Sequence, residues 1–156
     1  MSKTKPSALV AAEVPGRSRT GYPLEFAARV AGRNKQPLGE LFGLTNFGVN
    51  RTTLAPGSQS SLRHCHLVQD EFVYVLNGEL VLVDDEGETL LTAGMCAGFP
   101  HAGRAHHLIN RSSADAVYLE IGDRLPGDSA TYPDDDLVAE RDQSSWRFTR
   151  KNGVPY

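Results

Sequence analysis

Two features that decide the fold meet in residues 64–78, HCHLVQDEFVYVLNG. His64 and His66 are separated by one residue, and residues 73–75 are β-branched or aromatic, as strands prefer. Alternate side chains of a strand point to the same face, so the two imidazoles lie on one face about 6.6 Å apart along the backbone, and Cys65 faces the other way. On a helix the same two rings would stand about 200° apart. The pair therefore predicts a strand with two imidazoles able to converge on one ion.

A carboxylate and a third histidine complete a candidate metal site. Glu71 follows His66 by five residues, and an odd offset on one continuous strand would turn its carboxylate to the opposite face. A loop at residues 67–70 is therefore predicted, and His106 is the candidate for a fourth ligand. An H-x-H pair alone is weak evidence, but Glu71 and His106 strengthen it. Three imidazoles and a carboxylate without a thiolate suit one divalent metal ion, namely Fe, Mn, Ni, Co, Cu or Zn.

Short apolar runs separated by turn signals occupy residues 41–122 and predict an all-β sandwich or barrel. The runs are residues 41–47, 71–76, 79–83, 89–92 and 116–121. Between the second and third runs, Asn77-Gly78 is the strongest hairpin signal in the chain. It predicts a type I′ turn between strands at 72–76 and 80–83, because both central residues of that turn need a positive φ.

The composition on either side of this segment predicts two extensions. Residues 1–40 are rich in Pro, Gly, Arg and Ala, which predicts an N-terminal arm lying on the body of the protein. Residues 41–122 form the predicted barrel. Residues 123–156 are more polar and are expected to pack on the barrel as a C-terminal extension, with one further strand at 145–149.

Two longer patterns resemble the sequence motifs of the cupin superfamily. The first motif, G-x5-H-x-H-x3,4-E-x6-G, is similar to the series Gly57, His64, His66, Glu71 and Gly78. The second, G-x5-P-x-G-x2-H-x3-N, is similar to the series Gly94, Pro100, Gly103, His106 and Asn110. Each series carries one extra residue in a loop, where length varies at little cost. The extra residue before Gly103 leaves His106 and His107 as alternatives for the fourth ligand, and the three-residue gap to Asn110 favours His106.

The resemblance implies a double-stranded β-helix, the jelly-roll barrel of cupins, with the metal in its mouth. The ligands it implies are His64, His66, Glu71 and His106. It also implies a small-molecule substrate and a metal-dependent reaction: oxidative cleavage of the dioxygenase type, isomerisation or a lyase reaction. In any of them the catalytic Glu71 stays bound to the ion or detaches to move a proton. The alternative is a non-catalytic module that binds a small molecule or a sugar around a structural metal. Cupins often pair through their N-terminal strands, so a homodimer is expected.

The overall composition narrows the choice of partners. The net charge of −3 gives no electrostatic reason to expect nucleic acid or an anionic membrane as a partner. Two cysteines without a C-x-x-C pair and an apolar N-terminal stretch too short for a signal peptide predict a cytoplasmic protein. All four lysines, among them Lys35, fall outside the apolar runs, which argues against a lysine clamp on a sugar phosphate. Arg51 and Arg104 are the candidates for holding an anionic substrate.

Overall fold

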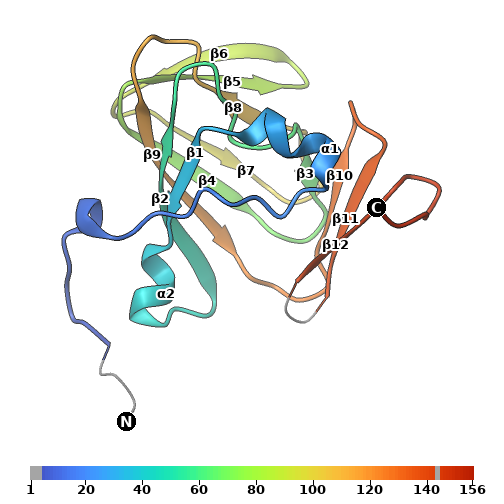
Figure 1. Ribbon diagram of the computed structural model, residues 1–156, viewed down its shortest axis with the longest axis horizontal. Coiled ribbons are helices and arrows are strands. Elements are labelled where there is room, and N and C mark those ends of the chain that lie inside the picture. The colour runs from blue at the N-terminus through green and yellow to red at the C-terminus, as the bar shows by residue number, and fades with distance from the viewer. Residues whose placement is uncertain (1–4, 143–144) are drawn as a thin grey trace.

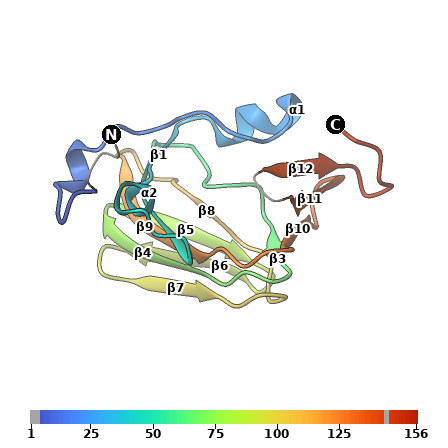
Figure 2. The ribbon, with the colours of Figure 1, turned by 90° about the horizontal axis from the view of Figure 1, so that it is seen from below.

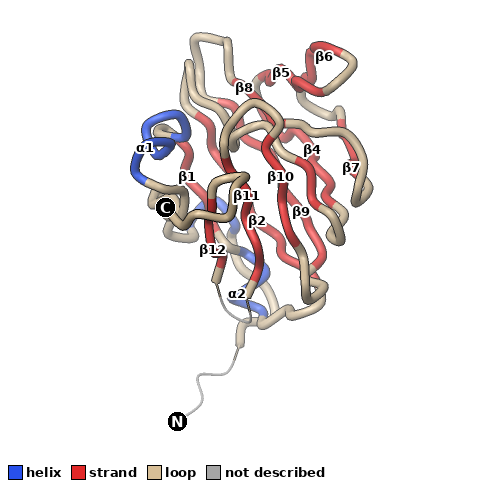
Figure 3. Tube along the Cα trace, turned by 90° about the vertical axis from the view of Figure 1, so that its right-hand side faces the viewer, coloured by secondary structure: helices blue, strands red, loops and turns tan. Residues whose placement is uncertain are grey.

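The computed structural model describes residues 5–142 and 145–156, and it is built mainly of β-strands (Figure 1). The strands are β1 (Arg33–Gln36), β2 (Phe47–Leu54), β3 (Cys65–His66), β4 (Glu71–Asn77), β5 (Glu79–Asp84), β6 (Gly87–Thr92), β7 (Cys96–Phe99), β8 (His107–Ile109), β9 (Ala116–Asp123), β10 (Ser129–Tyr132), β11 (Leu137–Arg141) and β12 (Trp146–Thr149). The helices are α1 (Leu24–Ala27), α2 (Leu38–Phe42) and the 3-10 turns Ala11–Glu13 and Ala28–Val30. Both α-helices lie at the periphery of the strands (Figure 3).

The described strands form three antiparallel sheets. A five-stranded sheet has the order β1-β2-β9-β4-β7, a three-stranded sheet the order β6-β5-β8, and a four-stranded sheet the order β12-β11-β10-β3. The first two sheets form the sandwich, and the four-stranded sheet lies at one end of it (Figure 2). This architecture confirms the predicted all-β jelly-roll fold. No helix of the described residues is both long and apolar enough to span a bilayer.

The main core lies between the five-stranded and three-stranded sheets. Its buried side chains are Leu54, Val73, Val75, Leu80, Leu82, Leu91, Leu108, Ala116 and Tyr118. Strand β4 shows the alternation that builds this core, because Val73 and Val75 are buried while Phe72 and Tyr74 are each 38% exposed. The inward face of β4 therefore begins at Glu71, two residues before Val73.

The hairpin predicted at Asn77-Gly78 is wrong. Strand β4 pairs with β7 and β9, whereas β5 pairs with β6 and β8, so the chain crosses here from one sheet to the other. Gly78 has a φ of +76°, but among the described residues Ala102 is the only non-glycine residue with a positive φ, which excludes a type I′ turn. Gly78 is required instead for a close approach, since a Cβ there would lie 2.9 Å from the carbonyl oxygen of Asp115.

The strand predicted at residues 41–47 is also wrong. The chain forms helix α2 at Leu38–Phe42, and strand β2 begins only at Phe47. Gly43 ends the helix in the left-handed region with a φ of +72°, where its N–H donates to the carbonyl oxygen of Glu40 at 3.1 Å. Glycine adopts this conformation readily and commonly ends a helix. A short helix therefore forms here, although the apolar residues at 41–47 had suggested a strand.

The four-stranded sheet joins the C-terminal residues to the loop region before β4. Strand β10 pairs with β3, with Ala130 opposite His66, and the strand predicted at 145–149 is found as β12. A second core lies under this sheet and includes Phe26 of helix α1. Its buried side chains are Phe26, Leu62, Ala130, Tyr132, Leu137 and Ala139. The predicted division of the chain at residues 40 and 122 stays a prediction.

Candidate metal centre

Three imidazoles surround one oxygen of the Glu71 carboxylate. The Nε2 atoms of His64, His66 and His106 lie 3.5, 3.6 and 3.2 Å from Glu71 Oε2. These four side chains, which are the four candidates named from the sequence, are thus brought together. The ligand atoms of His64, His66 and Glu71 all lie within 4.8 Å of one another, so this group could hold a metal ion.

Local pairing of the chain explains how these residues meet. His64 and His106 form an isolated antiparallel bridge, with His64 N–H donating to His106 O at 3.1 Å and His106 N–H donating to His64 O at 2.8 Å. The predicted loop at residues 67–70 is present and carries the chain from β3 to Glu71 at the start of β4. His106 and His107 are adjacent in an extended segment, so their side chains point to opposite faces. His107 faces away from the other imidazoles, and its Nδ1 lies 3.1 Å from the carbonyl oxygen of Ser61.

The far nitrogen of each imidazole also has an oxygen partner. His64 Nδ1 lies 2.9 Å from Leu62 O, and His106 Nδ1 lies 3.3 Å from Arg104 O. His66 Nδ1 lies 2.5 Å from a carboxylate oxygen of Asp128. Because these oxygens accept hydrogen bonds, a neutral imidazole in this position keeps its proton on Nδ1, which leaves Nε2 as the nitrogen available to a metal ion. Histidines that bind metals in proteins are oriented in this way.

The Glu71 side chain is 31% exposed, but one of its two carboxylate oxygens is buried and unsatisfied. Its Oε2 atom is buried and accepts no hydrogen bond from any described residue. Burial raises the pKa of this carboxyl, but hydrogen bonds and positive charge that the facing imidazoles of His106 and His64 supply in their protonated form lower it more, so that the pKa lies well below its usual range. A metal ion bound at the Nε2 atoms would supply this positive charge in place of those protons. An ionised, buried oxygen without a donor is costly unless a cation accompanies it.

The distances fit a shared cation. Two atoms that each lie about 2.1 Å from one ion are about 3.0 Å apart at a right angle and about 3.4 Å apart at the tetrahedral angle. Of the observed separations from Glu71 Oε2, 3.2 Å lies within this range, and 3.5 and 3.6 Å exceed it by 0.1–0.2 Å. Phe99 also fixes the plane of His106, since the two rings are stacked with centroids 3.4 Å apart. The residues present therefore fit a divalent metal ion.

The imidazoles and Glu71 line a cavity of about 630 Å³ that also contains cationic side chains. These are Arg33, Lys35, Arg124 and Arg141. The inference that lysine is missing from the β core is wrong, because Lys35 lies on β1, which pairs with β2 in the five-stranded sheet. The sequence pattern missed it because β1 is short and polar, without an apolar run to mark it as a strand.

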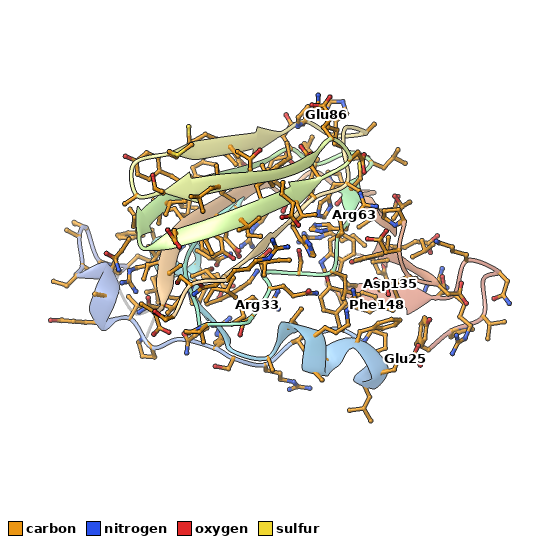
Figure 4. All side chains as sticks on the ribbon, turned by 90° about the horizontal axis from the view of Figure 1, so that it is seen from above. Glu25, Arg33, Arg63, Glu86, Asp135 and Phe148 are labelled. Carbon is orange, nitrogen blue, oxygen red and sulfur yellow. The ribbon has the colours of Figure 1, made fainter. Side chains whose placement is uncertain are left out.

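Arg33, on the same strand, also points inward. It donates to the carbonyl oxygen of Ser60 and lies toward the middle of the molecule, whereas Glu86 lies at its edge (Figure 4). The two arginines expected to hold an anion are engaged elsewhere. Arg51 donates to Gln36 Oε1 at 2.5 Å, and Arg104 pairs with Glu86 at 2.6 Å. The cations that line the cavity therefore come from β1 and from the C-terminal residues.

A second carboxylate and two hydroxyls complete the polar part of the cavity region. Glu120 Oε1 forms an ion pair with Lys35 Nζ at 2.5 Å and accepts a hydrogen bond from Asn50 Nδ2 at 2.9 Å. The hydroxyls of Tyr118 and Thr52 are buried without a hydrogen-bond partner. Burial raises the pKa of the Tyr118 phenol well above its usual value, so it stays protonated and can act as a donor.

Comparisons with a protein-family model and with solved structures point to the same family. The cupin domain model matches residues 50–122. A sugar phosphate isomerase of the cupin superfamily from Silicibacter pomeroyi is 43% identical, with a TM-score of 0.91 over 96% of this chain and 96% of that chain. A candidate sugar phosphate isomerase from Acidithiobacillus ferrooxidans is 29% identical, with a TM-score of 0.73 over 80% of each chain.

More distant structures share the fold alone. The polyketide cyclase RemF from Streptomyces resistomycificus is 17% identical, with a TM-score of 0.63 over 74% of this chain and 78% of that chain. No curated protein matches the sequence. The domain match, the 43% identity over nearly the whole length and the jelly-roll architecture together show that this chain belongs to the cupin superfamily.

Proposed function

We propose that this protein is a metal-dependent isomerase that acts on a phosphorylated sugar. The observation that carries the proposal is the buried Glu71 Oε2 atom, which faces three imidazole nitrogens and lacks a hydrogen-bond partner. In this proposal His64, His66, Glu71 and His106 bind one divalent metal ion. Bound there, the ion would supply Lewis-acid polarisation of substrate oxygens.

Glu120 is the group that we propose moves the proton. Interconversion of an aldose and a ketose takes a proton from one carbon and returns it to the neighbouring carbon, so no oxidant or reductant is consumed. Glu120 lies opposite Val73 in the β4–β9 pairing, and Val73 follows Glu71 on the inward face, about 7 Å along the strand. A carboxylate at this distance reaches a substrate that lies beside the metal ligands. Lys35 and Asn50 hold one oxygen of Glu120, which leaves the other for the proton.

The cavity cations support a phosphorylated substrate. Arginine matches the geometry of a phosphate group with paired N–H donors. Among the described residues, no side chain pairs with the Arg124 guanidinium. This group lies over Gly48, where a Cβ would be 3.2 Å from its Nε and Nη2 atoms. The sugar phosphate isomerase from Silicibacter pomeroyi, at 43% identity, gives independent support for this substrate class.

The test uses chelator-treated protein reloaded with each candidate divalent metal. Aldose phosphates from three to six carbons are incubated with it in deuterium oxide, and proton NMR follows both ketose formation and deuterium entering at the carbons beside the carbonyl. Glu120→Gln should retain the metal and lose about 10²–10⁴-fold in rate, the usual contribution of a general base. Glu71→Gln should lose both the metal and turnover.

Three results would count against the proposal. If no sugar phosphate is isomerised and no deuterium enters with any metal, the protein is not an isomerase of this class. Saturable binding of a sugar phosphate without exchange would favour the non-catalytic binding module instead. Full activity of Glu120→Gln would remove Glu120 from the proton transfer while leaving the isomerase assignment intact.

A further inference from the structure

Asp128 is a buried carboxylate outside the segment matched by the cupin domain model. Its side chain is 0% exposed, which is rare for an aspartate unless its oxygens are well satisfied. One oxygen, Oδ2, lies 2.5 Å from His66 Nδ1. The other, Oδ1, accepts hydrogen bonds from the backbone N–H groups of Val68 at 3.0 Å and Gln69 at 3.3 Å. Three donors therefore converge on this carboxylate.

The backbone on both sides of Asp128 is fixed by the four-stranded sheet. Its own carbonyl oxygen accepts a hydrogen bond from Arg141 N at 2.8 Å, and the carbonyl oxygen of Ser129 accepts one from Leu67 N at 2.8 Å. Ala130 then lies opposite His66 in the β3–β10 pairing. Strand pairing thus places Asp128 beside His66, and the hydrogen bonds from Val68 N and Gln69 N hold its carboxylate there.

The chemical result is a histidine with a fixed proton. Because an ionised carboxylate only accepts hydrogen bonds, the proton of neutral His66 must sit on Nδ1, and Nε2 is left with its lone pair. His64 and His106 obtain the same orientation from backbone carbonyl oxygens. Among the three imidazoles at the site, His66 is the one oriented by an ionisable side chain. A carboxylate behind a metal-binding imidazole raises its strength as a ligand.

We propose that Asp128 is a positioning residue for the metal centre, which holds His66 in the tautomer and orientation that bind a metal. The proposal rests on the proposed metal site. It assigns to Asp128, which follows the segment that carries the four ligands (residues 64–106), an indirect part in metal binding through His66.

Asp128→Asn separates this role from a packing role. The amide has the size of the carboxylate, and its oxygen can still accept from the N–H groups of Val68 and Gln69. Its NH₂ group, however, is a donor that faces His66 Nδ1. His66 must then give up the hydrogen bond or move its proton to Nε2, where it blocks the metal. Asp136→Asn is the matched control, because Asp136 is an exposed aspartate that accepts a hydrogen bond from Lys151 N at 2.8 Å.

The experiment measures zinc and cobalt affinity of chelator-treated protein by competition with a chromogenic chelator. Asp128→Asn should bind about 10–100-fold more weakly than the wild type, the usual effect of losing such a partner. Asp136→Asn should bind as the wild type does. Thermal unfolding of the metal-free forms reports any general loss of stability separately. Equal affinity of Asp128→Asn and wild type would overturn the proposal.

A second measurement needs no variant and no metal. Nitrogen-15 NMR of the histidine side chains in metal-free wild-type protein distinguishes the two neutral tautomers. The neutral form of His66 is expected with its proton on Nδ1, and a neutral form with its proton on Nε2 instead would overturn the proposal even if Asp128→Asn does not fold. If the wild type binds no divalent metal at all, the proposed metal site fails, while the tautomer measurement still decides whether Asp128 orients His66.

Discussion

Replacing Gly78 with alanine tests the crossing between the two sheets of the sandwich. Gly78 has a φ of +76°, and a Cβ at this position would lie 2.9 Å from Asp115 O and 3.0 Å from Ala116 Cα. Both neighbours are backbone atoms, at the first residue of β9 and the residue just before it, so neither can move away as a flexible side chain would. Gly78→Ala should therefore incur the cost of backbone strain and the cost of overpacking together.

Gly57 provides a control with the same backbone conformation. Its φ is also +76°, but a Cβ there would meet nothing within 4 Å. A non-glycine residue in the left-handed region costs about 1–2 kcal/mol, and both substitutions should show this amount. Forcing an extra methyl group against packed atoms adds about 1–3 kcal/mol at Gly78 only. We expect a loss of about 2–5 kcal/mol for Gly78→Ala, from these two costs together.

Urea unfolding of the metal-free proteins measures the difference directly. Chelator is needed because a bound metal would stabilise the folded state by an amount that depends on its concentration. Equal free energies of unfolding for Gly57→Ala and Gly78→Ala would show that the close approach at Asp115 does not constrain the fold. In that case the glycine would be required for its backbone conformation alone, and the account of the crossing given above would be wrong.

Three further predictions concern stability and assembly. Asn110→Ala should lower the free energy of unfolding by about 2–3 kcal/mol in urea, because the fully buried Asn110 amide donates to the carbonyl oxygens of Leu54 and Ala114. The hydrogen bond from Arg63 lowers the pKa of Asp134, so this pair stabilises the fold above the ordinary pKa of about 3.9 and loses its effect as the pH falls through the lowered value. Arg63→Gln should therefore cost less than about 1 kcal/mol at pH 7, and a gap from wild type that persisted at pH 2 would contradict this. Light scattering should give twice the mass of the 17.0 kDa chain if the expected homodimer forms, and a monomer mass would refute it.

The candidate site could be predicted because its geometry follows from short-range rules. Alternation on a strand places His64 and His66 together, and the loop at residues 67–70 reverses the odd offset to Glu71. The position of His106 required the second sequence motif, since nothing in the local pattern says that two strands far apart in the chain will pair. The same limit explains the wrong hairpin at Asn77-Gly78. The turn residues suggested that the two flanking strands pair with each other, whereas each of them pairs with strands from other parts of the chain.

Two residues near the site, Lys35 and Asp128, were not predicted from the sequence for a different reason. Lys35 lies on a short polar strand, and Asp128 lies in a turn just before β10, so neither stands in a pattern of apolar residues. Their positions depend on sheet pairing with distant segments, β1 with β2 and β10 with β3. A buried aspartate can be recognised only when its partners are known, because exposure is the normal state of the residue type.

The candidate metal ligands and the cavity cations come from different segments of the chain. The four candidate ligands lie within residues 50–122, the segment that the cupin domain model matches. The cations that line the cavity lie outside it, on β1 and in the C-terminal residues. A fold that supplies the metal ligands from one segment and the cavity cations from the segments before and after it can change its substrate without disturbing the ligands. Under the proposed function, the cavity residues outside residues 50–122 are therefore the ones to compare when a substrate is inferred.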